Sequence, residues 1–135
     1  MAHEAIQTIL PGMITNADFS TKQFYFAKVS TAADFTAAVC SVDGEPTIGV
    51  IQGNPANTGE AVSICVHGVT KAIASETITA GQFIKTASDG RAAICDITTT
   101  GADTGDHVVG VCLEGGAVNE KITIFFGAPY FKVAV

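Results

Sequence analysis

Apolar and polar residues alternate along two stretches of this chain, as they do in strands with one buried face. Val62, Ile64 and Val66 share one face of the first stretch, while small or polar residues and Cys65 occupy the other. Residues 121–126 repeat the pattern, with isoleucine or phenylalanine at every second position. A period of two is typical of a strand that packs one face on a core. The pattern therefore predicts half-buried strands at both places, the first over 61–67.

Shorter runs of β-branched and aromatic residues predict further strands, because turn dipeptides such as Asp43-Gly44 and Asp89-Gly90 separate them. We expect these strands over 23–29, 37–42, 47–51, 69–74, 82–86, 92–97, 107–113 and 130–133. Val, Ile and Thr make up 42 of the 135 residues, whereas Leu occurs only twice. β-Branched residues pack well on pleated surfaces and lose side-chain freedom in helices. The predicted fold class is mainly β, either a small β-barrel or a rolled β-sandwich.

The first 20 residues differ from the rest of the chain. Their apolar residues follow helical spacing over 4–9, so a short helix is one alternative and an extended arm is the other. Pro11-Gly12 interrupts any continuous element. An arm of this kind must dock on its own domain or on a partner to bury its apolar groups. We therefore divide the chain into an N-terminal arm, 1–20, and a single β domain, 21–135.

One pair of elements occurs twice in the chain: an apolar-Gly-Val strand, then a strand led by glutamate. Gly49 and Gly110 are 61 positions apart, and Glu60 and Glu120 are 60 apart, so a connecting loop differs by one residue. A glycine inside a strand often marks a bulge or a close backbone approach, which is the structural role we expect at Gly49 and Gly110. Matching elements upstream extend the similarity and predict an internal duplication. The two halves span about 21–67 and 80–126.

Charge and composition exclude several classes of protein. The net charge is −6 and Arg91 is the single arginine, which argues against binding to nucleic acid or to an anionic membrane surface. No apolar run is long enough to span a bilayer. The N-terminus lacks the basic and apolar regions of a secretory signal, so we expect synthesis in the cytoplasm. The four cysteines follow no metal-binding spacing, and we interpret them as reduced, buried thiols.

A search for catalytic chemistry finds little. The three histidines are scattered, and Cys65 and His67, which share a strand face, are better explained by packing than by a reactive pair. Asp103 and Asp106 could offer oxygens to a cation, but their loop lacks the ligand density of a calcium site, so a solvated loop is the better interpretation. We predict that the protein is not an enzyme and has no catalytic, cofactor-binding or metal-binding residues.

Several short motifs follow one another in a fixed order between residues 15 and 127. They lie at 22–29, 47–53, 59–62, 67–69, 78–84, 89–92 and 109–114. This order resembles that of the capsid decoration proteins of tailed bacteriophages, also called cement or head-stabilising proteins. The resemblance implies a small β-rich structural protein, often a homotrimer, on the outer capsid surface of the virion. It would bind the major capsid protein and stabilise contacts between capsomers, without a cofactor and without contacting nucleic acid or membrane.

In this interpretation the N-terminal arm is the candidate capsid contact. Its proposed contact residues are His3, Glu4, Ile6, Ile9, Leu10, Met13 and Ile14. The alternative function is a β-structured module that binds a ligand or receptor on the virion surface, which would require exposed aromatic rings. The chain has no tryptophan and most of its aromatic residues lie in predicted strands, which favours a core role. The apolar tail, 129–135, could pair into the sheet or enter a subunit interface.

Overall fold

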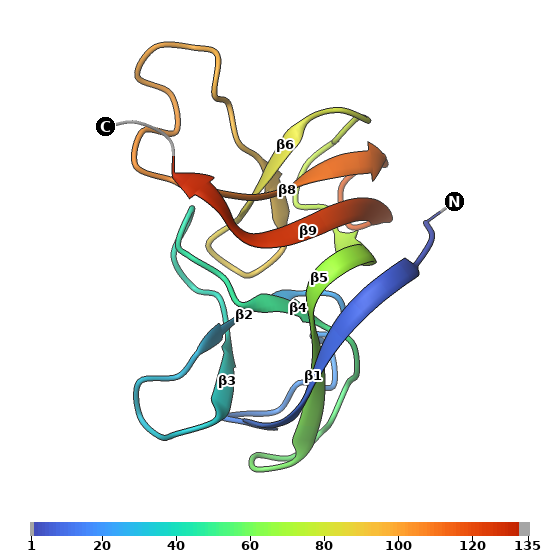
Figure 1. Cartoon of the computed structure of the whole chain (residues 1–135), viewed down its shortest axis with the longest axis vertical. Helices are drawn as coiled ribbons and strands as arrows, with labels where there is room; N and C mark the ends of the chain where they lie inside the picture. Colours follow the sequence, from blue (N-terminus) through green and yellow to red (C-terminus); the bar gives the residue numbers. More distant parts are fainter. Residues whose placement is uncertain (1, 133–135) are drawn as a thin grey trace.

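The chain folds as nine strands of one mixed sheet in a computed structural model that describes residues 2–132 (Figure 1). The strands are β1 (Ala5–Thr15), β2 (Phe26–Val29), β3 (Thr36–Val39), β4 (Gly49–Ile51), β5 (Ala61–Ile73), β6 (Phe83–Thr86), β7 (Ala92–Ile94), β8 (His107–Glu114) and β9 (Lys121–Lys132). The described residues form no helix, which confirms the prediction of a mainly β fold. No helix of the described residues is therefore long and apolar enough to cross a membrane.

The strands are hydrogen-bonded in the order β1-β3-β2-β4-β5-β9-β8-β6-β7, and β1 also pairs with β5. The pairings among the first five strands therefore form a closed circuit, in which β1 pairs with β3 and also with β5. The other four strands extend the sheet from β5, beginning with β9. β5 belongs to both groups: Ile64 and Cys65 pair with β4, while His67 to Ile73 pair with β9. Figure 1 shows the two groups one above the other, with β5 passing between them.

Two pairs of predicted strands are each a single long strand in the structure. Residues 61–67 and 69–74 join as β5 through Gly68, whose φ is +122° and which lies so close to β1 that an added Cβ would collide with the carbonyl oxygen of Ile6. At the other end, β9 continues to Lys132, whose backbone pairs with His107 of β8. The C-terminal tail therefore pairs into the sheet as far as Lys132, and residues 133–135 lie outside the described residues.

The N-terminal segment is a strand of the sheet. The short helix over 4–9 does not form, because Ala5–Thr15 are extended and form β1. β1 runs antiparallel to β5, with register shifts that include one between Leu10 and Met13, and it pairs in parallel with β3 at Ile14 and Thr15. Of the two docking alternatives, the structure shows the first: the segment docks on its own domain.

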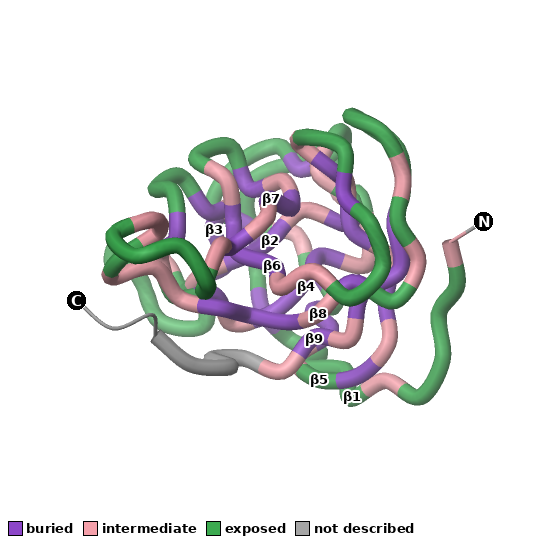
Figure 2. Tube along the Cα trace, turned by 90° about the horizontal axis from the view of Figure 1, so that it is seen from above, coloured by how far each residue is buried: buried purple, intermediate pink, exposed green. Residues whose placement is uncertain are grey.

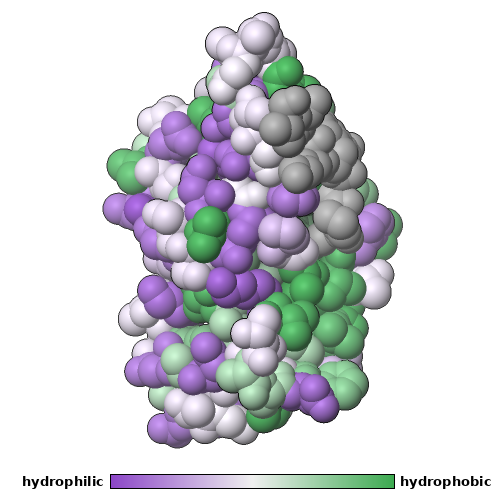
Figure 3. Space-filling view, turned by 90° about the vertical axis from the view of Figure 1, so that its left-hand side faces the viewer, coloured by the Kyte–Doolittle hydropathy of each residue, from purple (hydrophilic) through white to green (hydrophobic). Residues whose placement is uncertain are grey.

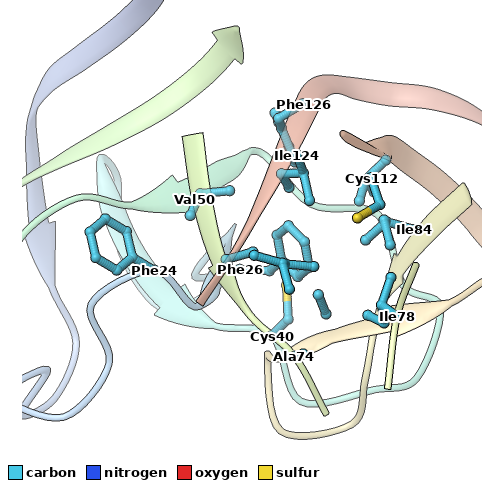
Figure 4. Packing of buried hydrophobic residues seen from close by; sticks show 14 residues of the cluster. Phe24, Phe26, Cys40, Val50, Ala74, Ile78, Ile84, Cys112, Ile124 and Phe126 are labelled. Atoms are coloured by element: carbon cyan, nitrogen blue, oxygen red, sulfur yellow. The ribbon is translucent and has the colours of Figure 1, made fainter. Parts of the chain in front are cut away.

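Two clusters of buried side chains form the core. The larger one joins residues from both halves of the chain, and Figure 4 shows how side chains from β2, β4, β6, β8 and β9 point into it. The rings of Phe26 and Phe126 both belong to it and lie 6.0 Å apart. The smaller cluster, around Phe19, Ile51 and Ile64, lies within the first five strands. Each fully buried large side chain contributes about 1.5–3 kcal/mol relative to exposure. Figure 2 shows the buried segments running through the middle of the molecule, with exposed loops around them.

The strand pairings repeat between the two halves. β2 pairs with β3 and β4, and β4 with β5; in the same way, β6 pairs with β7 and β8, and β8 with β9. The register agrees as well, since Ala27 faces Gly49 and Ile84 faces Gly110. The repeated pairing is a property of the structure, whereas an origin by duplication remains a prediction.

Gly49 and Gly110 lie at positions where the backbone of the next strand is very close. A Cβ at Gly49 would collide with the carbonyl oxygen of Cys65, and a Cβ at Gly110 with that of Phe125. A register shift also occurs between Val108 and Gly110. Each glycine thus allows the adjacent strand to approach more closely than any side chain would permit.

Candidate interaction surface

Exposed apolar side chains lie on β1, at the end of β2 and on the loop that joins β2 to β3. Six large ones are exposed there: Ile6, Ile9, Leu10, Ile14, Val29 and Phe35. Ile6 and Phe35 are the most open of these, with 93% and 74% of their surface exposed. Exposed apolar residues that cluster in this way often mark interaction sites in water-soluble proteins.

A groove runs between these two elements, with a volume of about 790 Å³. We call it the β1 groove, and it is lined by Leu10, Met13, Val29, Ser30, Thr31, Ala32, Ala33, Asp34 and Phe35. Asp34 is the single charged residue in this lining. The groove is therefore mostly apolar, with one acidic side chain.

The groove arises where two strands separate. The Ile14 N–H donates a hydrogen bond to the Phe35 carbonyl oxygen at 2.9 Å, and Ile14 and Thr15 pair with β3. On the N-terminal side of Ile14, β1 stays with β5, whereas the chain before β3 turns back toward β2. The described structure pairs this edge of β1 with no other strand from Ala5 to Met13.

The predicted contact residues are only partly available on this surface. Met13 is buried against the core, with 4% of its surface exposed, and it forms the floor of the groove. His3 is held by Glu114, whose Oε1 lies 3.0 Å from its Nδ1, and Glu4 pairs with Lys71 at 3.7 Å. The exposed apolar members of the predicted set are Ile6, Ile9, Leu10 and Ile14; His3 and Glu4 are exposed as well but are paired within the chain. The role of the set as capsid contacts remains a prediction.

Sequence reasoning missed Phe35. Its φ is +50°, a backbone region that non-glycine residues rarely adopt, yet its ring is largely in solvent. The equivalent turn of the second half has a glycine, Gly90, at this position, and that difference is the signal that could have revealed Phe35. Ser30 N–H donates to the Thr36 carbonyl, as Ala87 N–H donates to the Arg91 carbonyl, both at 2.7 Å. Phe35 therefore stands where the second half has a glycine.

A second cluster of polar side chains lies between the halves and is built around Lys85. The Lys85 Nζ donates to Asp43 Oδ2 at 2.8 Å, to Asp103 Oδ1 at 2.6 Å and to Asp106 Oδ2 at 2.7 Å. Burial lowers the pKa of Lys85, but the three carboxylates outweigh it and raise the pKa well above its ordinary value. The loop containing Asp103 and Asp106 is thus tied to β6 rather than simply solvated, and the cation between the carboxylates is a lysine of the chain itself.

The cysteines are buried and form no disulfide, as the sequence predicted. Burial raises the pKa of Cys40 to about 12 and that of Cys95 to about 11. The Cys65 thiol donates to the carbonyl oxygen of His67 at 3.5 Å, while the His67 ring packs edge-on against Phe125 with centroids 5.2 Å apart. Thiols with raised pKa values stay protonated at neutral pH, and a protonated thiol is a poor nucleophile.

Two further hollows lie elsewhere on the described surface. One, of about 430 Å³, is lined by residues of 81–83 and 94–98, and another, of about 740 Å³, lies beside β2 and β3 around Lys28 and Glu45. Lys28 and Glu45 pair at 3.2 Å, so their charges are already matched. Figure 3 shows that apolar side chains also gather on the side of the molecule that lies to the left in Figure 1.

Comparison with known proteins identifies a related fold. The chain matches no protein-family model and no curated protein sequence. Among solved structures, it is similar to the N base of the head fiber gp8.5 of bacteriophage phi29, as seen in a crystal structure. The TM-score is 0.64 and the alignment covers 90% of this chain and 95% of that chain, at 14% sequence identity. The two chains therefore share an all-β fold over nearly their whole lengths.

Proposed function

We propose that this chain is a structural protein of a bacteriophage head, attached to the outer surface of the capsid. The observation that carries the proposal is the fold shared with the base of a phage head fiber over 90% of this chain and 95% of that one. The order of sequence motifs, which resembles that of capsid decoration proteins, points independently to the same surface. Fold alone does not determine function, so the two lines of support are used together.

In its finer form, the proposal is that the protein binds the major capsid protein and stabilises contacts between neighbouring capsomers, as a homotrimer. The exposed apolar residues of β1 and the Phe35 loop supply a surface for such a contact. Many copies on one shell multiply a modest affinity per contact, because neighbouring sites are held at high effective concentration. Light scattering that gives a monomer both free and after release from capsids would count against the trimer.

The charge of the chain supports an outer rather than an inner position. The net charge is −6, and packaged DNA repels a protein of that sign unless cations are concentrated on one face. Arg91 is the single arginine, and its side chain bonds Asp89 and Asn119 at 2.7 Å each. This arrangement favours a partner made of protein over one made of nucleic acid.

A second candidate is a module that binds a ligand or receptor while it sits on the virion. The exposed Phe35 ring beside the β1 groove favours it, because aromatic rings are common in such sites. The candidates differ in one respect that can be measured. A capsid-stabilising protein raises the resistance of the shell to heat or chelator, whereas a receptor-binding module leaves that resistance unchanged.

The test of the proposal is binding of the purified protein to mature, expanded capsids and to immature capsids of the phage that encodes it. We expect the protein to co-sediment with expanded capsids at a saturable ratio and to bind immature capsids more weakly. Absence of binding to both kinds of capsid would remove the proposal.

A further inference from the structure

We propose that the partner enters the β1 groove as an extended polypeptide segment, which pairs with the free edge of β1 and buries the ring of Phe35. This inference rests on the proposed function, since it takes the segment to belong to the capsid. It adds the place of contact, its anchor residue and the chemistry of the segment.

The first observation is the conformation of Phe35. It has φ +50° where the equivalent turn of the second half has Gly90, with φ +89°. A non-glycine residue held in this region is strained, and such residues persist where the surroundings or a function require them. Glycine would serve the fold at this position without strain, as it does at Gly90.

Phe24 provides an internal comparison, because it has the same kind of backbone. Its φ is +68°, but only 6% of its surface is exposed, and the ammonium groups of Lys71 and Lys121 lie 5.5 and 5.7 Å from its ring centre. Burial of that ring offsets the strain of its backbone. Phe35 has no such compensation within the described chain, since 74% of its surface is in solvent. A partner that covers the ring would supply it.

The second observation is the edge of β1, which decides what kind of partner fits. From Ala5 to Met13 this edge pairs with no other strand of the described structure, and the groove lies beside its C-terminal part, at Leu10 and Met13. An unpaired strand edge offers alternating N–H and C=O groups, and the group that matches them best is the backbone of another strand. Protein edges are usually protected by charged side chains, prolines or bulges. Ala5–Thr15 contains no charged residue, and its single proline, Pro11, removes one N–H from the edge, so the residues on either side of it supply the groups for pairing.

Charge completes the description of the segment. Asp34 is the single charged residue that lines the groove, and the whole chain carries −6. A segment with apolar side chains facing Leu10 and Phe35, and with one lysine or arginine near Asp34, is complementary to this lining. A strongly acidic segment would be repelled.

The experiment compares two glycine variants of the full chain in binding to expanded capsids. Phe35→Gly removes the ring and relieves the backbone, so its melting temperature should equal or exceed that of the wild type, while its affinity falls at least tenfold. Asn119→Gly is the control: Asn119 also has a positive φ, +67°, but lies outside the groove, so the change should leave affinity unchanged. Hydrogen exchange supplies the second measurement, because the amides of β1 that face away from β5 should become protected when the capsid binds.

The outcomes separate the two proposals. If wild-type protein does not bind capsids, the proposed function fails and this inference fails with it. If wild-type protein binds and Phe35→Gly binds equally well, or if the β1 amides stay unprotected, the proposed function stands and the groove is not the contact. If Phe35→Gly instead lowers the mass of the free protein in light scattering, a second copy of the chain occupies the groove and the inference is overturned.

Discussion

Asp43 and Lys85 join the two halves of the chain: the Lys85 Nζ donates a hydrogen bond to Asp43 Oδ2 at 2.8 Å. Asp43 lies in the loop after β3, and Lys85 lies in β6. Nearby, the Gly44 N–H donates to the Thr86 carbonyl and the His107 N–H to the Gly44 carbonyl, both at 2.9 Å. The loop of the first half is therefore fastened to the second half by backbone bonds and by one shared lysine.

Lys85→Met should lower the free energy of unfolding by about 2–4 kcal/mol, because it leaves three neighbouring carboxylates without their cation. The matched control is Lys28→Met, since Lys28 has the equivalent place in the first half but pairs with Glu45 alone and is more exposed. We expect that control to lose about 1 kcal/mol or less. Urea unfolding of both variants measures the difference, and equal losses would contradict the role given to the cluster.

Asp103 should make the free energy of unfolding depend on pH in the acid range. Burial raises its pKa, but hydrogen bonds from Lys85 and from the Asp96 N–H outweigh burial and hold the pKa below its usual value. A carboxyl with a lowered pKa stabilises the fold above its unfolded pKa of about 4, and the stabilisation is lost as the pH falls through the folded pKa.

Asp103→Asn should therefore be less stable than wild type at pH 7, by about 1–2 kcal/mol for the lost charged hydrogen bonds. The difference should shrink as the pH falls below about 4, where Asp103 of the unfolded chain becomes protonated, and should vanish once the pH has fallen through the lower folded pKa. Urea unfolding at pH 7 and pH 3 checks this. A difference of the same size at both pH values would show that Asp103 does not carry the dependence.

The glycines inside the strands should tolerate no side chain. Gly49→Ala and Gly110→Ala should each lower the free energy of unfolding by about 2–3 kcal/mol, because the new methyl group forces the neighbouring strand away. Gly53→Ala is the control, since its nearest neighbour would be Pro55 Cδ at 3.8 Å. That control should change stability by about 0.5 kcal/mol or less. Thermal unfolding of the three variants tests the account, which fails if the strand glycines accept alanine as readily as Gly53.

The four cysteine thiols should not react with thiol reagents while the protein is folded. All are buried, and burial raises the pKa of Cys40 to about 12. A colorimetric thiol reagent at pH 8 should therefore titrate less than one thiol per chain on the timescale of minutes, and all four after addition of denaturant. Rapid reaction of a folded thiol would place that cysteine on the surface.

Local patterns allowed the strands of both halves to be predicted, but not the first strand. Period two marks a strand wherever one face is buried, as it is at Val62 and Ile64. β1 was not predicted as one strand because Pro11-Gly12 is typical of a break between elements. In the structure this dipeptide lies at a register shift between β1 and β5, with φ +89° at Gly12. An irregularity at an edge leaves pairing intact on both sides of it, and the sequence does not show where β5 will lie.

The candidate surface was only partly predictable for the same reason. Ile6, Ile9, Leu10 and Ile14 were singled out because they are apolar in a segment set apart from the repeat, and they are exposed. Met13 has the same character but faces the core, which depends on the register with β5. Phe35 reads as one more core aromatic, and only the comparison with Gly90 in the folded halves distinguishes it. The Lys85 cluster draws residues from three separate segments, which no local spacing reveals.

The central claim is that this chain sits on the outside of a phage head. Electron cryomicroscopy of expanded capsids incubated with the purified protein tests it most directly. We expect additional density of the size of this domain on the outer face, at positions where capsomers meet, with the β1 groove turned toward the shell. Capsids without added density, or with density on the inner face or confined to the tail, would contradict the claim.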